Sequence, residues 1–90
     1  MSQAIADPAE LRRFAQNLKR FSQEMNVQMS ALRGQFNGLG QTWRDKEHEK
    51  FGEEFDRTVQ AIAKFVDVTN QHIPFLLRKA DRVEEYLQQR

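Results

Sequence analysis

The chain has 90 residues, a net charge of +1 at pH 7, 30% charged residues and no cysteine. Ninety residues form one domain, 1–90, and the lack of cysteine excludes a disulfide, a thiol nucleophile and a zinc–thiolate site. The charges form no block of one sign, which argues against a nucleic-acid partner because such partners select a clustered basic face. No apolar stretch is long enough to span a membrane, and the first eight residues lack the features of a cleavable signal peptide.

The first predicted element is a helix over about residues 8–36. Asp7 fits the N-cap, Pro8 the first helical position, and Glu10 the positive end of the helix dipole. Apolar residues then recur at steps of three and four, which places them on one stripe. The stripe consists of Leu11, Phe14, Leu18, Phe21, Met25, Met29, Leu32 and Phe36. A cluster of three glycines (Gly34, Gly38 and Gly40) then predicts a turn at about residues 37–42.

The second predicted element is a helix over about residues 43–90. Thr42 with Asp45 resembles a capping box in which aspartate replaces the usual glutamate. Pro74 predicts a kink because it lacks an amide hydrogen. The apolar seam keeps its phase across Pro74, which favours one bent helix over the alternative of two separate helices. This seam runs Phe51, Phe55, Val59, Ile62, Val66, Thr69, Ile73, Leu76, Ala80, Val83 and Leu87.

These elements predict an all-α fold, an antiparallel two-helix hairpin with Trp43 at its central turn. If the chain reverses near Leu39, helix two from about His72 onward outruns helix one and leaves apolar residues uncovered. Helix two also has a second apolar stripe, and a helix with two apolar faces packs against two neighbours. We therefore expect two hairpins to form a four-helix-bundle dimer. The predicted partner interface consists of Phe65, Val68, His72, Phe75, Leu76 and Leu77.

The residues of the chain form no recognisable catalytic or ligand-binding set. Asp45 and His48 share a helix face, and we interpret them as a cap followed by an exposed histidine rather than as a metal or acid–base pair. His72 is interpreted as an interface residue. No nucleophile with a base and an orienting group can be assembled, and the glycines lack the Lys-Ser/Thr of a phosphate loop. We therefore expect no enzyme, no catalytic residue, no metal and no cofactor.

The residues around the turn resemble a known family. Trp43-Arg44-Asp45, with Leu39 before it and Phe51 and Phe55 after it, resembles the motif of the WXG-motif family, early-secreted-antigen-like helical hairpins associated with type VII secretion. The resemblance covers essentially the whole chain. Asp45 stands where the family has glycine, which marks a divergent member. Trp43 is either a plug that closes the hairpin end or a contact residue for a partner.

The resemblance implies a non-enzymatic protein that acts through dimerisation and protein–protein binding, as a secretion substrate or adaptor. It implies a homodimer, a heterodimer with a related hairpin, or a larger secreted protein as partner. The protein is then cytoplasmic, or secreted without a cleavable signal peptide. The family's Tyr-x-x-x-Asp/Glu secretion signal is incomplete, because Arg90 follows Tyr86 by four positions. This departure supports the alternative of a cytosolic structural adaptor with no secretion role.

Overall fold

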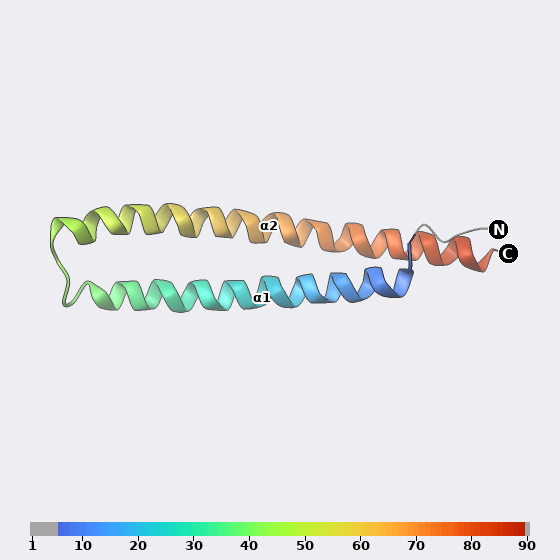
Figure 1. The fold of residues 1–90 in the computed structure, drawn as a ribbon, viewed down its shortest axis with the longest axis horizontal. Coiled ribbons are helices and arrows are strands. Elements are labelled where there is room, and N and C mark those ends of the chain that lie inside the picture. The colour runs from blue at the N-terminus through green and yellow to red at the C-terminus, as the bar shows by residue number, and fades with distance from the viewer. Residues whose placement is uncertain (1–5, 90) are drawn as a thin grey trace.

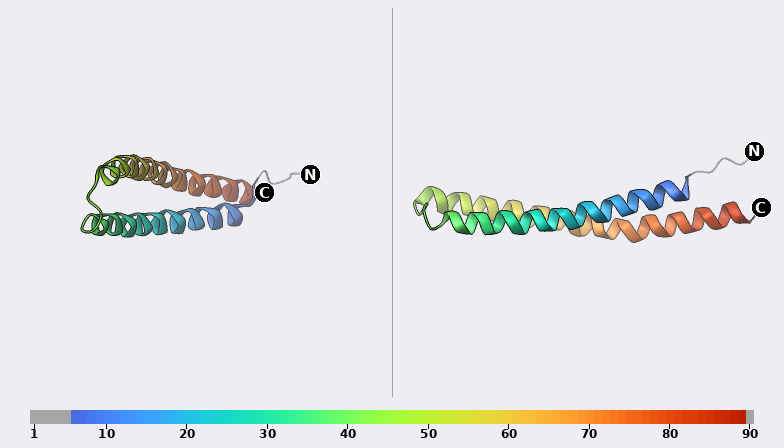
Figure 2. Two further views of the ribbon diagram at one scale, coloured as in Figure 1. Left: turned by 60° about the vertical axis from the view of Figure 1, so that its left-hand side comes forward. Right: turned by 90° about the horizontal axis from the view of Figure 1, so that it is seen from below.

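The computed structural model describes residues 6–89, which form two long antiparallel α-helices (Figure 1). Helix α1 spans Pro8–Leu39 and helix α2 spans Lys46–Gln88. The molecule measures 69 × 16 × 16 Å, and its radius of gyration is 20.4 Å, whereas a compact domain of this length has about 12 Å. The helices stay side by side and cross gently along the rod (Figure 2). The predicted all-α hairpin is confirmed.

Some sequence predictions lie outside the described residues. The prediction that no cleavable signal peptide is present depends partly on residues 1–5. Two further predictions concern Arg90, namely the end of helix two and the residue four positions after Tyr86.

Both helices begin at an aspartate cap. Asp7 Oδ1 accepts a hydrogen bond from the Ala9 amide at 2.9 Å, and Asp45 Oδ1 accepts one from the His48 amide at 3.0 Å. The predicted cap at Thr42 is wrong, because Thr42 lies in the connection and its hydroxyl donates to the Leu39 carbonyl. Asp45 satisfies an orphan amide of the first turn directly, so α2 begins three residues later than expected.

Helix α1 continues past residue 36, where the sequence predicts its end, and helix α2 is one helix across Pro74, as the preferred interpretation of the sequence expects. Helix α1 passes through Gly34 and Gly38, and Gly40 forms its C-cap. The Gly40 amide donates to the Asn37 carbonyl, and the Gln41 amide donates to the Gly38 carbonyl. None of the described glycines has a positive φ. Helix α2 runs through Pro74 without a break, so the alternative of two separate helices is wrong. Packing between the two helices outweighs the low helix propensity of Gly34, Gly38 and Pro74.

The register of the hairpin differs from the predicted one. The Ser22 hydroxyl donates to Asn70 Oδ1 at 2.7 Å, and Arg12 bonds to Glu84. Ala80 is completely buried, so α1 covers α2 almost to its end. The predicted overhang after His72 is therefore wrong. Residues 40–45 belong to neither helix, so the chain reverses later than Leu39 and the pairing shifts toward the end of α2.

The core between the helices is thin. Its buried residues within the described chain are Ala15, Ser22, Val59, Val66, Thr69 and Ala80. All of them are small or medium-sized, because two cylinders touch only along a line. The accessible surface is 7333 Å², whereas a compact monomer of 10.6 kDa exposes about 5,500 Å². The hairpin alone therefore exposes an unusually large surface to water for its mass.

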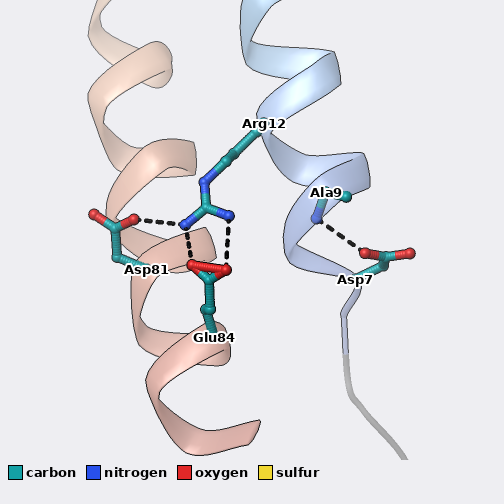
Figure 3. A network of polar contacts seen from close by, with 5 residues as sticks. All are labelled: Asp7, Ala9, Arg12, Asp81 and Glu84. Atoms are coloured by element: carbon teal, nitrogen blue, oxygen red, sulfur yellow. Dashed lines mark hydrogen bonds and ion pairs between the residues drawn. The ribbon is translucent and has the colours of Figure 1, made fainter. Parts of the chain in front are cut away.

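An ion-pair network ties the two helices together at the open end of the hairpin (Figure 3). The Arg12 guanidinium, from the second turn of α1, donates to both carboxylate oxygens of Glu84 at 2.8 and 3.3 Å and to Asp81 at 2.9 Å. These hydrogen bonds, that to Glu84 first, raise the pKa of Arg12 above its ordinary value. A bidentate guanidinium–carboxylate pair has a defined geometry, so the network holds the last turns of α2 against the start of α1.

We predict that Arg12→Gln loosens the open end of the hairpin. Asp81 and Glu84 both lose their cationic partner in this variant, so the amides of the last two turns of α2 should exchange hydrogen faster. Arg13→Gln is the matched control, because Arg13 pairs only with Glu10 of its own helix among the ion pairs of residues 6–89. Equal exchange rates in the two variants, measured by mass spectrometry, would contradict a role for Arg12 in joining the helices.

Candidate protein–protein interface

Five aromatic rings close the turn end of the hairpin. Trp43 packs edge-on against His48, with ring centroids 5.0 Å apart, and at a tilt against Phe51 at 6.0 Å. Phe36 of α1 stacks on His48 at 4.9 Å and contacts Phe55 at 5.2 Å. Each such pair contributes roughly 0.5–1.5 kcal/mol beyond its area burial. Phe36 therefore links the aromatic residues of α2 to α1.

Each residue of the turn motif has a structural contact. Trp43 is half-buried, and its amide donates to the Leu39 carbonyl at 2.8 Å. Arg44 Nε donates to the Gly40 carbonyl at 3.2 Å. Asp45 caps α2. These contacts agree with the interpretation of Trp43 as a plug for the hairpin end, and part of its surface remains accessible to a partner.

His48 differs from its predicted position. The sequence suggests an exposed histidine, but the ring is half-buried between Phe36 and Trp43. Its Nε2 is buried without a hydrogen-bond partner. The reason is the spacing from the cap, since the third residue after Asp45 points back toward α1. The Asp45 carboxylate meets the His48 backbone rather than its ring, and no three potential metal ligands gather anywhere in residues 6–89.

Gly52 lets α2 approach the aromatic cluster closely. A Cβ atom at this position would lie 3.2 Å from Cζ and 3.5 Å from Cε2 of Phe36. Phe36 is held by its stacking on His48 and its contact with Phe55, so its ring has little freedom to retreat. Gly34 and Gly38 differ, because nothing lies within 4 Å of a Cβ atom built there.

We predict different stabilities for alanine at two of these glycines. Gly38→Ala should raise the free energy of unfolding by about 0.5–1 kcal/mol, since it gains helix propensity and meets no neighbour. Gly52→Ala gains the same propensity but displaces Phe36, so it should be less stable than Gly38→Ala by about 1 kcal/mol or more. Denaturant melts at one fixed protein concentration measure the difference. Equal stabilisation by both substitutions would show that Gly52 is not needed for ring packing.

Exposed apolar residues of both helices lie along one side of the hairpin. The rings of Phe21 on α1 and Phe65 on α2 touch edge to face, with centroids 6.3 Å apart. Residues spaced by seven or four along each helix lie on the same side as these two. We call this surface the apolar face; its exposed members are Phe14, Phe21, Leu32 and Leu39 of α1 and Phe51, Phe65, Val68 and Phe75 of α2.

The predicted interface residues lie in three places in the structure. Phe65, Val68, His72 and Phe75 are exposed and lie together on the outer part of α2. Leu76 is half-buried, at the edge of the seam with α1. Leu77 lies on the other side of that seam, beside Ala15, Gln16 and Lys19 in a shallow hollow.

Sequence reasoning missed the contribution of α1 to the apolar face. Phe14 and Phe21 are 55% and 43% exposed, although the periodicity assigned them to the seam with α2. A usable signal was present in the sequence. These two aromatic residues are seven positions apart, beside a smaller pair at Ala15 and Ser22 that is also seven apart and is buried instead.

Comparisons with known proteins place the chain in a family. Residues 3–86 match the family model WXG100, described as proteins of 100 residues with WXG. The chain belongs to the WXG100 family. The resemblance drawn from the turn motif is thus confirmed, and Asp45 is a real departure from the glycine of the motif. No curated protein matches the chain.

This WXG100 protein is also similar to solved structures of EsxB, a secreted protein from Bacillus anthracis strain Sterne. The selenomethionine-labelled crystal structure has a TM-score of 0.79 and 29% identity, covering 96% of this chain and 98% of that chain. A wild-type crystal form has a TM-score of 0.79 and 30% identity, covering 93% and 97%. The two proteins thus share the hairpin over nearly their whole lengths. Neither helix described for the present chain is long and apolar enough to cross a membrane.

Proposed function

We propose that this WXG100 protein is a non-enzymatic binding module that pairs its apolar face with another helical hairpin to form a four-helix bundle. In this role it serves as a substrate or adaptor of a type VII secretion system. The main support for this proposal is the apolar face, which extends over both helices and stays exposed in the single hairpin. The partner is a second copy, a related hairpin, or a hairpin within a larger secreted protein.

The size of the exposed surface supports association. The chain exposes about 1,800 Å² more than a compact monomer of its mass. A standard protein interface buries about 800 Å² on each partner, so one partner along the apolar face fits within this excess. Apolar area removed from water contributes about 25 cal/mol per Å², and two hairpins packed face to face form the usual core of a four-helix bundle.

The similarity to EsxB supports a secretion role. EsxB is described as a secreted protein, and the match spans nearly all of both chains. On this proposal the protein is made in the cytoplasm and secreted without a cleavable signal peptide. Tyr86 is exposed on the last turn of α2, but the acid of the family signal is replaced by Arg90. A partner chain would then supply the complete signal.

We predict that Phe65→Glu weakens association about tenfold or more, because the new carboxylate would have to be buried at the centre of the interface. The helical circular dichroism should change little, since Phe65 is 52% exposed in the hairpin. Gln71→Glu adds the same charge at an exposed position off the apolar face and serves as the control. If sedimentation velocity at micromolar concentration shows the same association for both variants, the apolar face is not the binding surface.

We also predict that an export assay distinguishes the two proposed roles, secretion substrate and cytosolic structural adaptor. In cells that carry a type VII secretion ATPase, the protein should reach the culture medium, and deletion of the ATPase gene should keep it in the cell. The Phe65→Glu variant should be retained in both strains, because its pairing is impaired. Retention of the wild-type protein in both strains would instead favour the cytosolic adaptor, which the Tyr86–Arg90 departure supports.

A further inference from the structure

A shallow hollow lies on the side of the hairpin seam opposite the apolar face. Its volume is about 260 Å³, and its lining residues are Ala15, Gln16 and Lys19 of α1 and Asn70, Ile73, Pro74 and Leu77 of α2. We call it the Pro74 hollow. Leu77 remains 38% exposed, although the sequence predicts it in the partner interface. A hairpin bound to the apolar face would not cover Leu77, so the hollow is a separate surface.

Pro74 leaves one backbone acceptor of α2 without its helical donor. In an α-helix, the carbonyl of residue 70 accepts a hydrogen bond from the amide of residue 74. Proline has no amide hydrogen, although α2 remains one helix through this position. Pro74 is exposed, and carbonyls on the solvent side of a helix tilt outward. The Asn70 carbonyl is therefore open to a donor from outside the helix.

The polar side chains around the hollow complement an acidic group. Lys19 is the charged residue of the lining, and no ion pair within residues 6–89 involves it. Gln16 precedes it by three positions and lies on the same face of α1, where its amide can donate. Asn70 Oδ1 accepts a hydrogen bond from the Ser22 hydroxyl, which leaves the amide nitrogen of that side chain as a donor. The lining thus offers one cation and two amide donors, with no acidic side chain among them.

We propose that the Pro74 hollow binds an extended segment of a partner protein, with one acidic side chain at Lys19 and a neighbouring aliphatic side chain on Leu77. An extended segment has amides that can donate to the Asn70 carbonyl, whereas the amides of a helix are already bonded within it. Lys19 attracts an acidic segment and repels a basic one. The partner of this hollow therefore differs in kind from the helical hairpin proposed for the apolar face.

The size of the hollow agrees with a short peptide anchor. Sites for small molecules have volumes of about 300–1,000 Å³, and this hollow is smaller. A single aliphatic side chain matches it better than a whole organic ligand, and Ile73 and Leu77 provide apolar neighbours. Because the hollow and the apolar face lie on opposite sides of the seam, both can be occupied at once. The inference thus goes beyond the proposed function by adding a binding surface that does not depend on hairpin pairing.

A display library of random nine-residue peptides provides the probe. The full-length protein is the target, and counter-selection on the Leu77→Asp variant, which places a carboxylate in the hollow, removes peptides that bind elsewhere. The remaining peptides should share an aspartate or glutamate beside an aliphatic residue. One of them, labelled with a fluorophore, is then titrated with each protein by fluorescence anisotropy. If no peptide distinguishes the two targets, or if the remaining peptides lack an acid, the inference is overturned.

Two variants test the charge and the backbone acceptor separately. Lys19→Glu should bind the peptide about fivefold more weakly or worse. Lys64→Glu makes the same change at an exposed position outside the hollow and should leave the affinity unchanged. Pro74→Ala supplies the missing amide to the Asn70 carbonyl, so the peptide should bind about threefold to tenfold more weakly. The hairpin of this variant should melt at a higher temperature, which separates lost binding from lost folding.

The results separate this inference from the proposed function. Weaker binding to both Lys19→Glu and Pro74→Ala, with unchanged binding to Lys64→Glu, supports the peptide site. Wild-type affinity in either of the first two variants overturns it, because the cation or the open carbonyl is then not used. Loss of peptide binding in Phe65→Glu also overturns it, since the peptide then occupies the apolar face. A chain that stays monomeric and is not exported contradicts the proposed function but does not alter these results.

Discussion

Two helices touch along a single line, and most properties of this protein follow from that constraint. The contact line holds small and medium-sized side chains such as Ala15, Val66 and Ala80, because a larger residue would push the helices apart. The aromatic residues therefore lie away from the contact line, where there is space for their rings. One group closes the turn end around Phe36, and the other lies on the apolar face around Phe65. The first group completes the hairpin, whereas the second remains largely exposed, with Phe21 and Phe65 43% and 52% exposed.

The turn shows how a divergent motif can preserve its physical role. Asp45 occupies the position that is glycine in the family motif, and it forms the N-cap of α2 with an extended backbone and a carboxylate bonded to the His48 amide. Aspartate and glycine are both accepted at N-caps, and aspartate adds a hydrogen bond that glycine lacks. The substitution therefore keeps the entry into α2 intact. Trp43 then lies before the cap, where its ring reaches His48 and Phe51 rather than continuing the helix.

The sequence predicts local features well and the register poorly. Asp7, the periodic apolar residues and the position of the turn follow from short-range rules, and they predict the hairpin. The register depends on the length and path of the connection over residues 40–45, which belongs to neither helix and carries no periodicity. This is why the overhang after His72 was expected although Arg12 bonds to Glu84. Periodicity also shows which side of a helix is apolar, but not how much of that side one neighbour covers. The exposure of Phe14 therefore follows from the smaller residue beside it, Ala15, and not from the apolar period.

On the proposed function, helix α2 uses largely separate residues for the hairpin and for association. Val59, Val66 and Ala80 face α1, whereas Phe65, Val68 and Phe75 remain outside. The two sets overlap only in the contact of Phe65 with Phe21, so a substitution on the outer side can change pairing without removing the buried contacts that hold the hairpin. The energies of the two events are still linked, since a partner that binds only the folded hairpin stabilises it by mass action. A thin core makes this link important: the weaker the hairpin is alone, the larger the share of its stability that comes from the partner on the apolar face.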